Sequence, residues 1–96
     1  MKTLLIDDIR TIPATYTART YQDGIRKLST ESWDLLLLDH DLGCFDDTTG
    51  RELTGYDIVC WLEKNPNHLP KTTKLVTSNP VGRDRMNLVL KSLYKK

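Results

Sequence analysis

The sequence predicts one α/β domain over residues 1–96, with about four mostly parallel strands in the order 2-1-3-4 and about three helices. Short apolar runs alternate with amphipathic helical patterns along the chain, and two of these runs end in acidic residues. The length of 96 residues, with 39% hydrophobic and 28% charged residues, suits one globular core and leaves no room for two. The longest apolar run is the four leucines at 35–38, so no membrane span is expected.

The first two strands are expected at residues 3–6 and 15–20. The first is a continuous apolar run, as in a strand buried on both faces, and the second is rich in Thr and Tyr. The link at 9–14 contains Pro13 and is too short for a normal helix, so the helix after the first strand is expected to be missing. At ~3.3 Å per residue an extended link can return along one strand, which favours a parallel second strand. A hairpin of the two strands is the alternative.

The middle of the chain predicts a helix, a central strand and a long loop. Thr20 is a good N-cap for a helix that ends near Ser32, with apolar residues spaced for one face. The leucines at 35–38, followed by Asp39, predict the central strand. Residues 40–53 show no clear period and predict a loop, whose part at 44–53 either closes over a ligand as a lid or stays open.

The last part of the chain predicts a helix, a strand and a second helix. Residues 54–57 have the pattern of a helix start, and Pro66 ends that helix at Asn65. The fourth strand is expected at residues 74–77. Asn79 followed by Pro80 then predicts the start of the last helix.

Acidic residues follow two strands that are expected to be neighbours. Asp7 and Asp8 follow the first strand, and Asp39 and Asp41 follow the third. Carboxyl ends of neighbouring parallel strands share one edge of the sheet, where ligands bind. Such a cluster repels itself unless a cation neutralises it, and oxygen ligands suit Mg²⁺ or Mn²⁺. We expect Asp7, Asp8 and Asp39 to hold the metal; the alternative is a set of solvated loop carboxylates.

His40 stands between two acids and has two interpretations. With Asp39 and Asp41 it forms a candidate catalytic group, in which His40 or Asp41 acts as a general acid or base. The alternative is a paired His40 that only orients its neighbours. His68 lies in a polar segment and is expected at the surface.

An anion site is expected where the last helix begins. Free N–H groups and the helix dipole favour a phosphate there. The expected phosphate-binding residues are two arginines, three hydroxyl or amide side chains and one glycine: Arg10, Thr77, Ser78, Asn79, Gly82 and Arg83. Arg85 is expected to be a solvated side chain instead.

Composition narrows the range of partners. Residues 1–50 carry five Lys/Arg and nine Asp/Glu, a net −4, whereas residues 51–96 carry nine and four, a net +5. This asymmetry indicates either a bipolar surface or chance scatter. No aromatic residues are interleaved as in a single-strand nucleic-acid platform, and neither duplex DNA nor a membrane is expected as a partner. The two cysteines predict free thiols in a reducing cytoplasm.

These motifs resemble the receiver domain of response regulators, which has a flavodoxin-like fold. The resemblance rests on the acid pair, on Asp39 after the leucine strand, on the 55–57 helix start and on Thr77. It implies that Asp39 accepts a phosphoryl group, that the acid pair holds Mg²⁺ and that Thr77 senses the phosphoryl group. The first helix, the fifth strand and the fifth helix of receivers are expected to be missing.

The chain is more similar to a receiver-derived family, the cyclic-phosphate processing receiver domains, whose members are small and often bacterial or phage-encoded. Four motifs carry the resemblance in order: Asp-Asp-x-Arg-x-x-Pro at 7–13, His-Asp-Leu-Gly at 40–43, Thr-Gly-Tyr-Asp at 54–57 and Asn-Pro-x-Gly at 79–82. The resemblance implies a Mg²⁺-dependent phosphoesterase that acts on an RNA 2′,3′-cyclic end or a cyclic nucleotide. Val76 stands where the family pattern has a His. This departure favours the alternative, a receiver-like binding module that contacts a host protein or sequesters a nucleotide.

Overall fold

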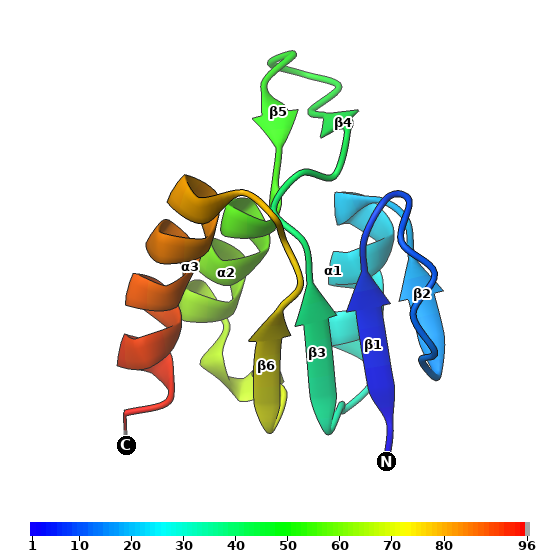
Figure 1. Cartoon of the computed structure of the whole chain (residues 1–96), viewed down its shortest axis with the longest axis vertical. Helices are drawn as coiled ribbons and strands as arrows, with labels where there is room; N and C mark the ends of the chain where they lie inside the picture. The colour runs from blue at the N-terminus through cyan, green and yellow to red at the C-terminus, as the bar shows by residue number, and fades with distance from the viewer. Residues whose placement is uncertain (96) are drawn as a thin grey trace.

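A computed structural model describes residues 1–95 and has a four-stranded parallel sheet at its centre (Figure 1). Its strands are β1 (Thr3–Ile6), β2 (Tyr16–Ala18), β3 (Leu35–Leu38) and β6 (Thr72–Leu75). The strand order is β2-β1-β3-β6, and every pair is parallel. The predicted α/β class and strand order are therefore confirmed.

The connection from β1 to β2 contains no helix between residues 7 and 15, as predicted, and the hairpin alternative is wrong. Leu4 pairs in parallel with Tyr16, only twelve positions along the chain. The backbone N–H of Thr15 donates to the carbonyl of Thr3 (2.9 Å), and the N–H of Thr3 donates to the hydroxyl of Thr15 (2.9 Å). Thr15 therefore aligns the start of β2 with the start of β1.

Three α-helices pack on one face of the sheet within the described residues. They are α1 (Tyr21–Thr30), α2 (Gly55–Lys64) and α3 (Pro80–Leu93), and Figure 1 shows α1 behind β1 and β3. Alternate strand residues, which share one face, join residues of all three helices in the core: Leu4, Ile6, Leu36, Leu38, Leu28, Ile58, Leu62, Met86 and Leu90. Their burial removes a large apolar area from water and fixes the helices against the sheet.

Each helix starts at a side-chain cap predicted from the sequence. Thr20 accepts from the N–H of Asp23, Thr54 and Asp57 form a capping box, and Asn79 accepts from the N–H of Gly82. The first helix ends at Thr30, two residues before its predicted end, and a 3-10 turn, η1 (Pro66–His68), follows α2. The caps of α2 and α3 matter for function because they fix the backbone beside the acidic residues.

Two sequence-based expectations are corrected. The last strand runs from Thr72 to Leu75 instead of 74–77, because pairing with β3 begins at Leu35↔Thr72 and ends at Leu38↔Leu75. Residues 40–53 are not wholly irregular, because β4 (Cys44–Phe45) pairs antiparallel with β5 (Glu52–Leu53). The turn between them is closed by the N–H groups of Thr48 and Thr49, which donate to Asp46. Figure 1 shows this hairpin projecting beyond the carboxyl ends of the central strands.

Among residues 1–95, no helix has the length and apolar character needed to cross a membrane. Cys44 and Cys60 are both free thiols.

Candidate functional site

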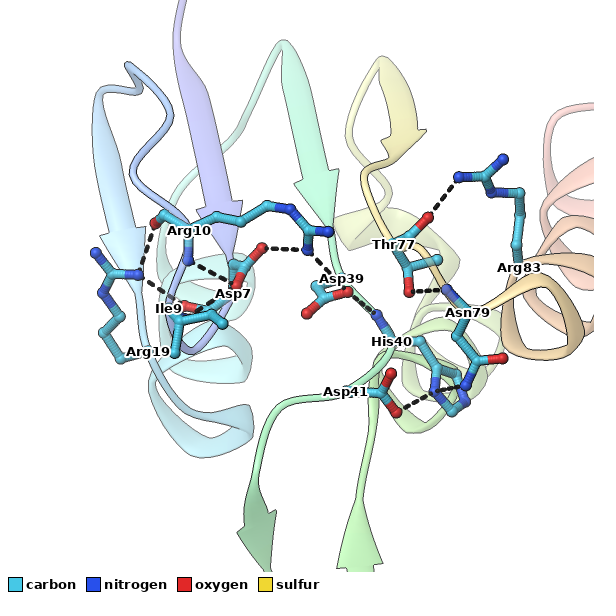
Figure 2. Close-up of polar contacts among 10 residues, drawn as sticks. All are labelled: Asp7, Ile9, Arg10, Arg19, Asp39, His40, Asp41, Thr77, Asn79 and Arg83. Atoms are coloured by element: carbon cyan, nitrogen blue, oxygen red, sulfur yellow. Dashed lines mark hydrogen bonds and ion pairs between the residues drawn. The ribbon is translucent and has the colours of Figure 1, made fainter.

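Two buried carboxylates and a buried hydroxyl lie where the central strands end. Asp7 follows β1 and is fully buried, Asp39 follows β3 and is 5% exposed, and Thr77 lies just beyond β6 and is 2% exposed. The backbone continues the strand hydrogen bonding here, since the N–H of Asp39 donates to the carbonyl of Ile6 (3.0 Å). The parallel register of β1 and β3 therefore brings the two carboxylates together, as Figure 2 shows.

Asp8 joins these two acids in a cluster that suits a metal ion. Asp7, Asp8 and Asp39 each offer a carboxylate oxygen, and the three oxygens lie within 4.8 Å of one another. This donor set has only oxygen atoms, which fits Mg²⁺ or Mn²⁺ better than a soft metal. Gly43 adopts a positive φ of 62° beside Asp8, and a β-carbon there would lie 3.1 Å from an Asp8 oxygen. The loop after β3 therefore leaves room for the Asp8 side chain.

Arg10 supplies positive charge to the same two buried acids. Its Nη1 atom lies 3.1 Å from Oδ2 of Asp7 and 3.3 Å from Oδ1 of Asp39. The other oxygen of Asp7, Oδ1, accepts hydrogen bonds from the backbone N–H groups of Ile9 and Arg10, each 3.0 Å long. One guanidinium nitrogen thus bridges the ends of two neighbouring strands (Figure 2).

The two carboxylates differ in pKa because their partners differ. Burial alone would raise the pKa of Asp7, but the backbone N–H groups of Arg10 and Ile9 and the Arg10 side chain outweigh it and lower the pKa. For Asp39, burial and the charge of Asp7 raise the pKa above its usual value, although hydrogen bonds from Thr77 and His40 act in the other direction. Asp39 is therefore the less readily ionised member of the pair.

Arg19 fixes the backbone that carries these groups, a role that the sequence reasoning missed. Its Nη1 atom donates to the carbonyl of Arg10 (2.7 Å) and to the carbonyl of Asp7 (3.3 Å). The signal available was its position directly after β2, at the same edge of the sheet as the acids. Arg19 thus holds the loop after β1 in place through two of its carbonyl groups.

His40 is held by a carboxylate on one side and a helix on the other. Its Nδ1 lies 3.0 Å from Oδ1 of Asp41 and 3.4 Å from Nδ2 of Asn79. A carboxylate oxygen can only accept, so the contact with Asp41 corresponds to a proton on Nδ1 and a lone pair on Nε2; the Asn79 amide nitrogen, itself a donor, is then a neighbour of Nδ1 and not its hydrogen-bond partner. The backbone N–H of His40 also donates to Oδ1 of Asp39 (2.9 Å), so the imidazole is fixed relative to the acidic cluster.

Two glycines permit this arrangement by their lack of a side chain. A β-carbon at Gly55 would lie 2.1 Å from the carbonyl oxygen of Asp39, and one at Gly82 would lie 2.5 Å from the His40 ring. The N–H of Gly55 donates to the carbonyl of His40 (2.8 Å). From the sequence, Gly55 is predicted only as part of a helix start, because its contact with Asp39 depends on how β3 and α2 pack.

The residues expected to bind phosphate differ in whether they reach the pocket beside the acids. Ser78 is exposed and lines an open pocket of about 290 Å³. The remaining lining of that pocket is Asp8, Ile9, Arg10, Asp39 and Asp41. Thr77 lies beneath, where its Oγ1 accepts from the N–H of Asn79 (3.1 Å).

Gly82 and Arg83 take part in local structure at the start of α3. The N–H of Gly82 donates to Oδ1 of Asn79 (3.0 Å) and is used by the helix cap. The guanidinium of Arg83 donates to the carbonyl of Thr77, and Figure 2 shows it on the side of Thr77 away from Asp39. Phosphate contacts by these two residues stay a prediction.

Arg85, two residues after Arg83 on α3, is exposed, and its guanidinium lies 4.4 Å from the centre of the Tyr56 ring. His68 lies beside Trp61, with 5.6 Å between ring centres. The side chains of Arg85 and His68 therefore contact aromatic rings and not the acidic cluster.

Comparison with known proteins gives one family and no individual relative. The family model of the cyclic-phosphate processing receiver domain matches residues 2–92. Neither the curated proteins nor the solved structures gave a significant match. The match includes every strand, the helices α1 and α2, and α3 up to its last residue, together with the acidic cluster and His40. The chain therefore belongs to the family of cyclic-phosphate processing receiver domains.

Proposed function

We propose that this domain is a Mg²⁺- or Mn²⁺-dependent phosphoesterase that acts on a cyclic phosphate, either an RNA 2′,3′-cyclic end or a cyclic nucleotide. The observation that carries the proposal is the placement of three carboxylate oxygens within 4.8 Å of one another, two of them on buried side chains, beside an oriented imidazole. Arg10 supplies one positive charge to these three acids, so a divalent ion would reduce the remaining repulsion between the buried carboxylates. The family membership supports a phosphate as the ligand.

Asp7, Asp8 and Asp39 would hold the divalent ion. When bound, the ion would supply positive charge to a phosphate oxygen and increase the acidity of a water molecule. Asp7 and Asp39 are fixed by the sheet register and by hydrogen bonds from neighbouring backbone N–H groups, so these two acids need little rearrangement on binding. This preorganisation is what an electrostatic site requires.

His40 and Asp41 would handle the protons of the reaction. In hydrolysis, a water oxygen forms a bond to phosphorus, one ester P–O bond of the ring breaks, and the departing oxygen takes up a proton. Nε2 of His40 would accept the proton of the attacking water and return it to the departing oxygen. Asp41 would orient the imidazole through Nδ1 during the transfer.

A second candidate function is binding without turnover, as a module that sequesters a nucleotide or contacts a host protein. It is favoured by Val76, which stands where the family pattern has a His. The backbone N–H of Val76 donates to the carbonyl of Leu38 (3.0 Å), and its side chain offers no proton donor. A mechanism that needs two imidazoles would therefore lack one of them.

The test is hydrolysis of 2′,3′- and 3′,5′-cyclic nucleotides with Mg²⁺ or Mn²⁺, followed by ³¹P NMR for the monoester product. Asp39→Asn should abolish turnover, whereas Asp84→Asn, which makes the same change at an exposed position on α3, should retain it. Full activity in Asp39→Asn would overturn the assignment. A ligand-dependent rise in Tm with the ligand left intact would establish the binding function instead.

A further inference from the structure

We propose that Arg10 is a tethered counterion that occupies the cation position of the acidic cluster and must leave it when a divalent ion binds. The inference rests on the proposed metal site and describes how that site is controlled. The observation is that a single atom, Nη1 of Arg10, lies within 3.3 Å of both Asp7 and Asp39. These are two of the three acids that would hold the ion.

Only one of the two carboxylate oxygens of Asp7 is available to a cation. Its Oδ1 already accepts two backbone N–H groups, from Ile9 and Arg10. Its Oδ2 is the oxygen that bonds to the Arg10 guanidinium (3.1 Å). A divalent ion bound to Oδ2 would therefore replace the hydrogen bond from Arg10. If the guanidinium stayed within hydrogen-bond distance of the same oxygen, its positive charge and that of the ion would repel each other.

The side chain of Arg10 can move while its backbone stays in place. Its N–H is bonded to Asp7 and its carbonyl to Arg19, so both sides of the residue are fixed. Its side chain is 34% exposed and borders the open pocket that also contains Asp41 and Ser78. Rotation about the side-chain bonds would move the guanidinium from the carboxylates into this pocket, where it would meet a phosphate.

Charge balance explains why Arg10 would leave the acids when a divalent ion binds. Without a divalent ion, the three acids keep one close positive partner in Arg10. With the ion bound, the carboxylates no longer need that partner, and a guanidinium prefers a phosphate oxygen as a bidentate partner. Metal binding and phosphate binding would then favour each other. The ion replaces Arg10 as the partner of the acids, and the phosphate becomes the new partner of Arg10.

The experiment is isothermal titration of the full chain with Mn²⁺, in the absence of any phosphate ligand. Arg10→Gln should bind Mn²⁺ roughly three- to tenfold more tightly than the wild type, as expected for removal of a partly screened ion pair. Arg85→Gln is the matched control, since it removes the same charge from a residue that contacts Tyr56 and not the acids. It should bind Mn²⁺ with the wild-type affinity.

Three other outcomes would overturn the inference, and they are distinguishable. Equal or weaker affinity in Arg10→Gln, with binding lost in Asp39→Asn, would reject the competition and keep the metal site. Equal gains in Arg10→Gln and Arg85→Gln would assign the effect to overall charge. Absence of Mn²⁺ binding even in Arg10→Gln would reject both the competition and the metal site.

A measurement on the unmodified chain removes any dependence on how the variant folds. The Nε–H signal of Arg10, assigned through its own side-chain correlations in the unmodified chain, should shift in ¹⁵N NMR spectra as Mg²⁺ saturates the amide shifts of Asp7 and Asp39. An Arg10 signal that stays unchanged while those amides shift would contradict the displacement.

Discussion

The imidazole of His40 lies directly against the backbone of Gly82. A β-carbon at position 82 would come within 2.5 Å of two ring carbons and 2.9 Å of Nδ1. The first turn of α3 therefore forms one wall for the ring, while Asp41 anchors its Nδ1. Gly82 is a positioning residue in this arrangement.

Gly82→Ala should lower turnover of a cyclic phosphate by roughly 10–100-fold, because a displacement of about 1 Å in a catalytic group can cost that much. Mn²⁺ affinity should stay unchanged, because the new methyl group is directed at His40 and not at the acids. Steady-state kinetics and Mn²⁺ titration would separate the two effects. Val81→Ala, at an exposed neighbouring position, is the control. A normal turnover rate in Gly82→Ala would show that the ring position does not matter.

Gly55→Ala should destabilise the fold more than loss of the adjacent helix cap does. The added β-carbon would lie 2.1 Å from the carbonyl oxygen of Asp39, a backbone atom that cannot move without disturbing β3. We expect a loss of about 1–3 kcal/mol or more in the free energy of unfolding. Urea denaturation would measure it, with Thr54→Ala as the reference at about 1 kcal/mol. Equal stability of Gly55→Ala and the wild type would contradict the close packing.

The two buried acids should have opposite effects on stability at pH 7. The pKa of Asp7 is lowered in the fold, so its charged form contributes stability that is present above the unfolded pKa and lost as pH falls through the folded pKa. The pKa of Asp39 is raised, so its protonated form is favoured, and stability is lost as pH rises through that folded pKa. With divalent ions removed by EDTA, Asp7→Asn should therefore lower Tm and Asp39→Asn should raise it.

Thermal unfolding at pH 7 and at pH 4 would measure both differences, and the gain from Asp39→Asn should shrink at the lower pH. The same direction of change in the two variants at pH 7 would contradict the opposed pKa shifts.

Addition of Mg²⁺ should stabilise the wild-type chain through the folded state alone. At a concentration 100 times the dissociation constant, the expected gain is about 2.7 kcal/mol in the free energy of unfolding. Amide NMR shifts should cluster at Asp7, Asp8, Asp39 and Asp41, and both effects should disappear in Asp39→Asn. Unchanged spectra at millimolar Mg²⁺ would remove the basis for metal-dependent catalysis.

Much of the fold was predictable because its signals are local. Apolar runs ending in acids identified β1 and β3, and the capping residues Thr20, Thr54 and Asn79 identified the starts of all three helices. The position of β6 was less predictable, since Thr72 and Thr73 pair with β3 without being apolar. Its register depends on a partner far away in the sequence.

The candidate site was predictable in its acids and less so in its arginines. Asp7, Asp8 and Asp39 converge because parallel strands share an edge, which follows from the strand order. Arg10 was expected to contact phosphate, but the sequence contains no sign that its guanidinium lies against two carboxylates. The contacts of Arg19, Gly55 and Gly82 likewise depend on tertiary distances that no sequence pattern encodes.

The missing helix between β1 and β2 also bears on the order of folding. A parallel pair usually closes a crossover of a dozen or more residues that includes a helix. Here Leu4 meets Tyr16 after twelve positions, whereas Leu35 meets Thr72 after thirty-seven. Pairing of β1 with β2 closes the shorter loop, so it costs less chain entropy and joins residues that are closer in the sequence. Asp7, Asp8 and Arg10 lie within that short loop, so we expect three of the four charged groups of the site to come together with this local contact, before β6 pairs with β3.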